Sequence, residues 1–182
     1  MTRLPPLPAD AMTPDQKRVH DAIVSGPRGA IAGPFGPWLR SPELADRAQQ
    51  LGAFCRFGSS LPPRLSELAI LVTARHWTAQ FEWWAHARMA REGGLAEPVI
   101  EAIRDRRRPE AMQADEAAVH DYCAAALGQG RVDDATYARV VETLGEVAAV
   151  ELVGIIGYYC LVSLTLNVFG VEVPDGSTPL AD

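Results

Sequence analysis

The sequence predicts an all-α protein with about seven or eight helices. Helix-start signals recur: Thr13-Pro14 and Ser41-Pro42 each place a capping side chain before a proline at the first helical position. Alternating apolar and polar runs bounded by turn residues are absent, so no strand is expected. The chain has 182 residues, 48% of them hydrophobic, which suits one helical domain spanning residues 1–182 with a sizeable core.

The N-terminal part is predicted to hold one helix between two irregular segments. Residues 1–12 are rich in proline and form a loose arm. A helix should follow to about Ser25, with Thr13 as its cap and Gln16 at the capping-box position. Residues 26–40 are a Gly/Pro loop whose apolar side chains must be held against the body of the protein, and such loops often line pockets. These side chains are Ile31, Phe35, Trp38 and Leu39.

The middle of the chain is predicted to form three helices. The first begins at Ser41 and ends at Gly58, with an apolar stripe made by Leu44, Ala48, Leu51 and Cys55. A long helical segment then runs to the stop at Gly93-Gly94. A turn near residues 76–77, with Thr78 as a cap, would divide it into two antiparallel helices, and a kinked continuous helix is the alternative.

The C-terminal part is predicted to be helical almost throughout. Helices are expected at about residues 96–107, 111–127 and 133–144, and an exposed tail at 171–182. Residues 147–168 are apolar enough and long enough to cross a bilayer. The segment contains Glu151, two tyrosines and Asn167, and no Lys or Arg lies close to either end. We therefore expect a core or subunit-interface helix and no membrane.

The composition disfavours several classes of protein. The net charge of −6 predicts no phosphate-binding surface and so no nucleic acid. The three cysteines form no C-x-x-C motif, which is typical of reduced thiols in a cytoplasmic protein. No G-x-G-x-x-G motif or P-loop is present, so no organic cofactor is expected.

The segment FEWWAHAR, residues 81–88, is the strongest candidate for a reaction site. Glu82 and His86 are four residues apart and share a helix face. With a turn at 76–77, Glu67 lies about nine residues before the turn and His86 about nine after it, so the two would face each other. A histidine beside carboxylates suits acid/base chemistry, and walls made by Trp83 and its neighbour suit a flat apolar substrate.

Two other interpretations of these residues stay open. Glu82 and His86 could form a partly exposed ion pair without function. Glu67, Glu82 and His86 could also offer three metal ligands, but H-E-x-x-H is absent and the other histidines have no ligand spacing, so no metal is predicted.

The segment ELAILVTARHWTAQFEWWAHARMAREGGL, with GYYCLVSLTLNVFGVEVP near the C-terminus, resembles the carboxymuconolactone decarboxylase family, which is similar in fold to alkylhydroperoxidase D (AhpD). The likeness covers most of residues 40–174. The peroxidase branch uses Glu, Cys-x-x-Cys and His; here the Glu falls on Glu67 and the His on His86, while the cysteine positions fall on Ala79 and Glu82. The resemblance implies the branch without redox cysteines, an AhpD-like helical bundle, and assembly as a homo-oligomer, a trimer or a hexamer.

The resemblance also implies a reaction: loss of CO₂ from a cyclic unsaturated, lactone-like carboxylic acid, as in aromatic catabolism. His86 is the expected proton donor, Glu82 its partner and Glu67 the group that orients the imidazole. Hydration and isomerisation are alternatives on this fold. The substrate-binding residues expected are Arg75 or Arg40 for a carboxylate, and Trp83, Trp38 and Phe35 for the ring.

Two functions of other classes also remain. The scaffold could serve as a non-catalytic oligomeric binding protein. It could instead support thiol-dependent redox chemistry through a lone cysteine such as Cys55 or Cys160.

Overall fold

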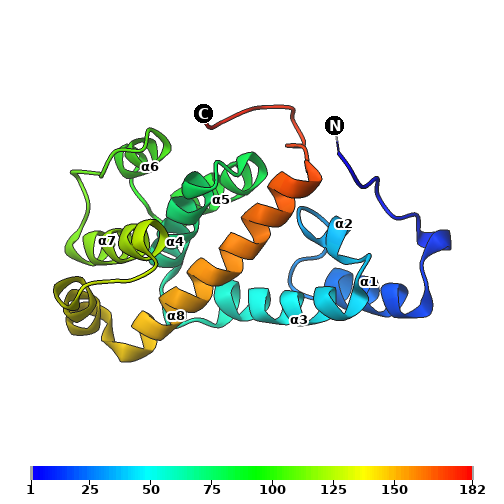
Figure 1. Ribbon diagram of the computed structural model, residues 1–182, viewed down its shortest axis with the longest axis horizontal. Coiled ribbons are helices and arrows are strands. Elements are labelled where there is room, and N and C mark those ends of the chain that lie inside the picture. The colour runs from blue at the N-terminus through cyan, green and yellow to red at the C-terminus, as the bar shows by residue number, and fades with distance from the viewer. Residues whose placement is uncertain (1, 182) are drawn as a thin grey trace.

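The computed structural model describes residues 2–181 and confirms the all-α prediction. Within these residues there are eight α-helices, one 3₁₀ turn (η1) and one π-helical turn (η2), and no strand (Figure 1). Positions 1 and 182 of the predicted domain, arm and tail lie outside the described residues. The bounds are η1 Ala9–Ala11, α1 Pro14–Ser25, α2 Phe35–Trp38, α3 Pro42–Ala53, η2 Phe54–Gly58, α4 Pro63–His76, α5 Gln80–Glu92, α6 Glu97–Arg104, α7 Ala114–Gln129 and α8 Asp134–Phe169.

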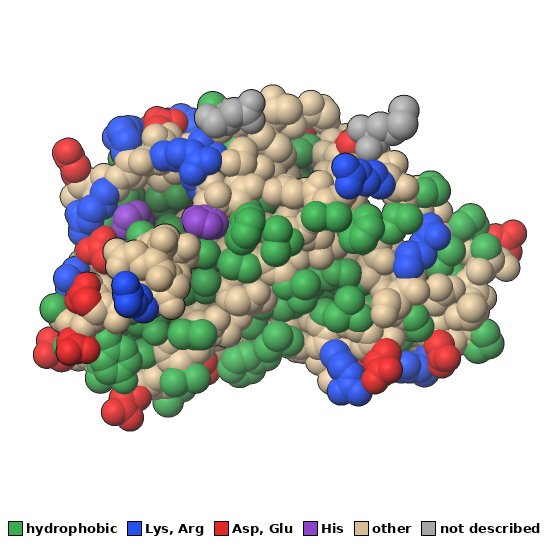
Figure 2. Space-filling model, in the orientation of Figure 1, with side chains coloured by type: hydrophobic (Ala, Val, Ile, Leu, Met, Phe, Trp, Pro, Cys, Tyr) green, Lys and Arg blue, Asp and Glu red, His purple; other side chains and the backbone are tan. Residues whose placement is uncertain are grey.

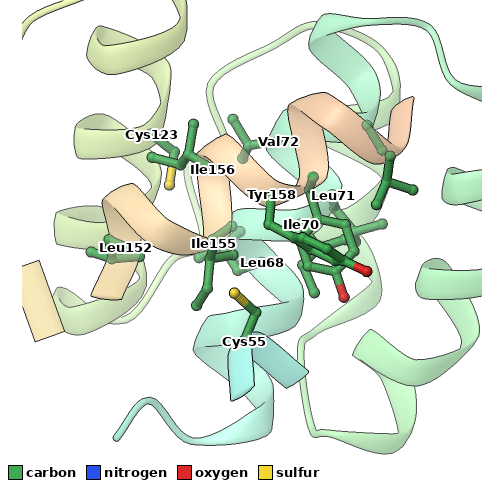
Figure 3. Close-up of a cluster of buried hydrophobic side chains, with 14 of the residues drawn as sticks. Cys55, Leu68, Ile70, Leu71, Val72, Cys123, Leu152, Ile155, Ile156 and Tyr158 are labelled. Atoms are coloured by element: carbon green, nitrogen blue, oxygen red, sulfur yellow. The ribbon is translucent and has the colours of Figure 1, made fainter. Parts of the chain in front are cut away.

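Helix α8 crosses the middle of the molecule, with α4 to α7 on one side of it and α1 to α3 on the other (Figure 1). Its inner face packs on α4 and α7 to make the main core. Figure 3 shows Leu152 and Ile155 of α8 against Leu68 of α4, with Cys55 and Cys123 filling gaps at the edges of the cluster. All five side chains are almost fully buried, so α4 and α8 fix the frame on which the other helices sit.

The N-terminal helices follow the predicted start signals, but one predicted stripe is wrong. The capping box at Thr13 and Gln16 forms as expected. On α3 the stripe through Leu44 and Leu51 is exposed, and the small residues Ala45, Ala48 and Gly52 face the core instead. The α3 helix lies close against its neighbours, and small side chains permit that approach.

The turn between α4 and α5 decides the geometry of the candidate site. The chain turns at residues 77–79, so two helices form and the continuous helix is excluded. Thr78 does not cap α5, whose N-cap is Ala79. Thr78 adopts a positive φ of 46° and its hydroxyl accepts hydrogen bonds from Arg75 and Arg106, which stabilise this strained position.

The helix predicted at 133–144 and the apolar segment after it join in α8. Gly145, with φ 88° and ψ 166°, breaks the helical backbone between them, so the predicted boundary corresponds to a real kink. By length and composition α8 could cross a membrane, yet half of its most apolar window is buried against the rest of the protein. This burial supports the interpretation as a core helix.

Both terminal segments are more firmly attached than predicted. The arm is not loose: the backbone N–H of Arg3 donates to the carbonyl of Phe169, and the Thr2 hydroxyl donates to that of Gly170. The tail is not exposed throughout, because Val173 and Leu180 are buried. Backbone groups of Leu180 exchange hydrogen bonds with the side chain of Gln80, which ties the tail to the start of α5.

Candidate active site

A buried histidine between two carboxylates is the chemical centre of the site. His86 Nδ1 lies 2.6 Å from Glu67 Oε2, and His86 Nε2 lies 2.9 Å from Glu82 Oε1. Glu67 comes from α4, while Glu82 and His86 share a face of α5, so the antiparallel pairing of α4 and α5 assembles the three groups within one chain. All three side chains are less than a tenth exposed.

The imidazole of His86 is held in its charged form. Burial by itself lowers the pKa of this group, but the negative charges of Glu82 and Glu67, together with their hydrogen bonds, raise it further, and the result is a pKa of about 9. At neutral pH the ring therefore carries a proton on each nitrogen and donates one to each carboxylate. Such a group is suited to act as an acid.

His86 and Glu82 open onto a cavity of about 240 Å³. Its walls come from the Gly/Pro loop, the π-helical turn η2, and helices α5 and α8. Cavities of about 150 Å³ hold a benzene ring, so this one has room for a ring with a substituent. Its other lining residues are Arg28, Ala30, Ala32, Gly33, Pro34, Phe35, Arg56, Phe81, Trp84, Ala85, Met89, Tyr158, Tyr159 and Val162.

The aromatic residues predicted to hold a ring are only partly those of the cavity wall. Phe35 lines the cavity as predicted. Trp83 points into the core, and Trp84 lines the cavity in its place. Trp38 stands behind the wall: its indole N–H donates to Thr165, and its ring packs against that of Tyr158 at 6.2 Å.

The two arginines predicted to hold a carboxylate are engaged elsewhere, so that prediction is wrong. Arg75 is buried and donates to the backbone carbonyls of Arg104 and Ala181, which ties α4 to the tail. Arg40 is exposed and donates to the carbonyl of Pro5. The guanidiniums at the cavity are those of Arg28 and Arg56.

The tyrosine pair of α8 escaped the sequence-based assignment. The ring of Tyr159 contacts that of His86 edge-on, with centroids 5.2 Å apart, and Tyr158 contacts Tyr159 in the same way. Burial raises the pKa of both hydroxyls, so both stay neutral. Two adjacent tyrosines in a segment otherwise apolar were the available signal, since a buried phenol needs polar company.

Gly52 leaves the space that one wall of the cavity needs. A Cβ atom at this position would lie 2.1 Å from the Tyr158 hydroxyl and 2.8 Å from a terminal nitrogen of Arg28. Because Tyr158 is packed between Trp38 and Tyr159, its ring cannot simply swing aside.

We expect Gly52→Ala to lower the free energy of unfolding by about 1–3 kcal/mol, as overpacking does. It should also weaken any ligand of the cavity, because Tyr158 and Arg28 must shift. Chemical denaturation measures the first effect. Gly128→Ala is the control, since a Cβ there meets nothing within 4 Å; equal stability of the two variants would contradict the packing argument.

The cysteines do not belong to the site. None of the three thiols lines the cavity. Burial raises the pKa of Cys55 to about 11 and that of Cys123 further, which suppresses the reactive thiolate. Within residues 2–181, no group of three or more His, Cys, Asp or Glu side chains is arranged to hold a metal ion.

Comparison with known proteins supports the fold. No protein-family model matches the sequence, and no curated protein matches it. Among solved structures the chain is similar to the crystal structure of an alkylhydroperoxidase AhpD core, an uncharacterized peroxidase-related protein from Ralstonia eutropha JMP134. The TM-score is 0.74 at 15% sequence identity, over 96% of this chain and 93% of that one. The chain therefore has an AhpD-like fold, as predicted.

Proposed function

We propose that the protein is a lyase of the carboxymuconolactone decarboxylase type, which removes CO₂ from a cyclic unsaturated carboxylic acid by acid/base chemistry. The observation that supports this most is the charged His86 between Glu67 and Glu82 at the wall of an aromatic-lined cavity. Because His86 and Glu82 are buried and reach the cavity together, the proton they share is available to a bound ligand and protected from bulk water.

In this mechanism the bond between the ring and its carboxylate breaks, and CO₂ leaves. The electron pair passes into the conjugated carbonyl and forms an enolate. His86 supplies the proton that the ring carbon then takes up, through the Nε2–H that Glu82 holds at the cavity wall. Glu67 keeps the ring in place through Nδ1 and stabilises its charge. One proton from solvent restores His86, so atoms and charge balance.

The reaction is tested by incubating the purified protein with a panel of cyclic unsaturated carboxylic acids and measuring CO₂ release and product mass. Hydration and isomerisation would appear in the same assay as a mass gain of water or no mass change. Release of CO₂ at rates above the uncatalysed background supports the proposal. Absence of any turnover, with ligand binding retained, would favour the binding-protein alternative.

A thiol-dependent redox function is the second alternative, and the peroxidase-related name of the structural neighbour makes it worth a direct test. Raised thiol pKa values and the distance of the cysteines from the cavity disfavour it. Alkylation of all thiols in unfolded-free, native protein should leave turnover unchanged. Loss of turnover upon alkylation of Cys160, the most exposed thiol, would favour it.

We also propose that the protein is a cytoplasmic homo-oligomer, a trimer or hexamer, assembled through α8. The outer side of α8 carries exposed apolar side chains at Val147, Val150, Leu161, Leu164 and Val168. With the glycines at 154 and 157, these positions alternate in steps of three and four, the spacing of a seam between paired helices. Residues 152–170 contain no charged side chain. Figure 2 shows hydrophobic side chains gathered along this face.

Val150→Glu is expected to dissociate this assembly, because it would place a carboxylate in the seam of each copy, where burial of an unpaired charge is costly. The measurement is the molar mass by sedimentation or light scattering. Tyr137→Glu is the matched control, since Tyr137 is equally an exposed hydrophobic residue of α8 but lies before the kink. A monomeric wild-type protein, or an unchanged mass in Val150→Glu, would contradict the proposal.

A further inference from the structure

Two arginines line the cavity without a carboxylate partner among residues 2–181. The Arg28 guanidinium lies over the ring of Phe35 at 4.9 Å and donates to the Gln49 carbonyl at 3.3 Å and to the Tyr158 hydroxyl. Arg56 donates to the thioether sulfur of Met89, a weak acceptor. Each guanidinium has five N–H donors, so most of these donors face no strong acceptor.

Other partly buried arginines of the protein are used differently. Arg64 is bound by the carboxylates of Asp115 and Glu116, and Arg91 by that of Glu97. A half-buried guanidinium ordinarily finds such a partner because desolvation is costly. Arg28 and Arg56 are the departures from this pattern, and both lie at the same cavity.

The two guanidiniums belong to the same wall. A terminal nitrogen of Arg28 lies over Gly52, 2.8 Å from where a Cβ would be, and Arg56 follows Gly52 by four residues, about one helical turn. Arg56 belongs to the π-helical turn η2, a backbone form often found at functional sites. The rings of Phe81 and Trp84 come from α5, so the cavity has a cationic wall and an aromatic wall.

The charges of the site also point to an anion. The cavity region holds two guanidiniums and the imidazolium of His86, against the carboxylates of Glu67 and Glu82. One positive charge is left without compensation, and a ligand with a single negative charge would neutralise it.

We propose that Arg28 and Arg56 form an anion-binding subsite, and that the cavity takes a flat, single-ring ligand carrying one carboxylate or equivalent monoanionic group. The guanidiniums bind the anionic oxygens, and the ring lies against Phe81 and Trp84. This inference rests on the proposed function in one respect: in the decarboxylation, the same pair would hold the oxygen on which the electron pair settles when CO₂ leaves.

The test is calorimetric titration of the full chain with benzoate and with benzamide, which has nearly the same shape but no charge. Wild-type protein should bind benzoate at least about 10-fold more tightly, because hydrogen bonds to a charged group are worth that much or more. Arg56→Gln should weaken benzoate about 10- to 100-fold and leave benzamide nearly unchanged. Arg28→Gln is the second variant and should behave in the same way.

Arg88→Gln is the matched control, because Arg88 is exposed on α5 and pairs with Glu92 away from the cavity. Thermal melting confirms that each variant is folded. Equal affinity for benzoate and benzamide, no benzoate binding, or unchanged benzoate affinity in both folded Arg28 and Arg56 variants would overturn the proposal.

The same measurements separate the subsite from the reaction. Selective benzoate binding in a protein that releases CO₂ from no acid of the panel would support the subsite and overturn the proposed lyase function. Release of CO₂ without preference for benzoate over benzamide would do the reverse.

Discussion

His86→Gln is expected to lower turnover by about 10³-fold or more, within the range known for loss of a general acid. The amide of Gln can still donate a hydrogen bond between Glu67 and Glu82, but it carries no proton that a substrate carbon can take. The helices should remain, because the core around α4 and α8 does not depend on this ring. The measurement is CO₂ release per enzyme under saturating substrate, with circular dichroism to confirm the fold.

The control for this variant is His76→Gln. His76 lies exposed at the end of α4, far in the chain from the carboxylates that hold His86, and contacts the ring of Trp77. Turnover in His76→Gln should equal that of the wild type. Near-normal turnover in a folded His86→Gln protein would remove His86 from the mechanism and with it the acid/base proposal.

The stability of the protein should fall as the pH rises from about 6.5 to about 9. The pKa of His86 is about 9 in the folded chain, against an ordinary value of 6.5. A group with a raised pKa contributes its full stabilisation below the lower value and loses it as the pH rises through the higher one. From this difference we expect the free energy of unfolding to fall by on the order of 3 kcal/mol across the interval.

Urea unfolding at several pH values between 6 and 10 measures this effect, and NMR of the imidazole locates the titration directly. The His86→Gln variant should lack this part of the pH dependence, because no ring is left to titrate. Equal slopes for the two proteins, or an imidazole that titrates near 6.5, would show that the carboxylates do not hold the charge on His86.

Much of the fold could be predicted because its signals are local. Capping residues, prolines at the first helical turn and glycine stops act through neighbouring backbone groups, so Thr13, Pro42 and Gly93 mark helix ends in the sequence alone. The apolar α8 was recognisable for the same reason. The AhpD-like fold followed from a resemblance carried by the segment around His86.

The surroundings of each side chain could not be predicted in the same way. Trp83 and Trp84 are adjacent and chemically equivalent, and a rotation of about 100° on α5 decides that the first enters the core and the second the cavity. Arg75 and Arg40 had the right charge, but the tail and the arm returned to bind them. Arg28 and Arg56 reach the cavity from segments that carry no motif.

The sequence by itself determined which groups are available: an acid/base set at Glu67, Glu82 and His86, a chain of helices, and no C-x-x-C pair. The tertiary structure decided what these groups can do. It closed the turn at Thr78 so that two carboxylates bracket one imidazole, and it turned two arginines from distant segments toward the same cavity. The physical reason is that helix propensity and capping depend on residues a few positions apart, whereas burial, charge pairing and the pKa of His86 depend on contacts between residues far apart in the chain.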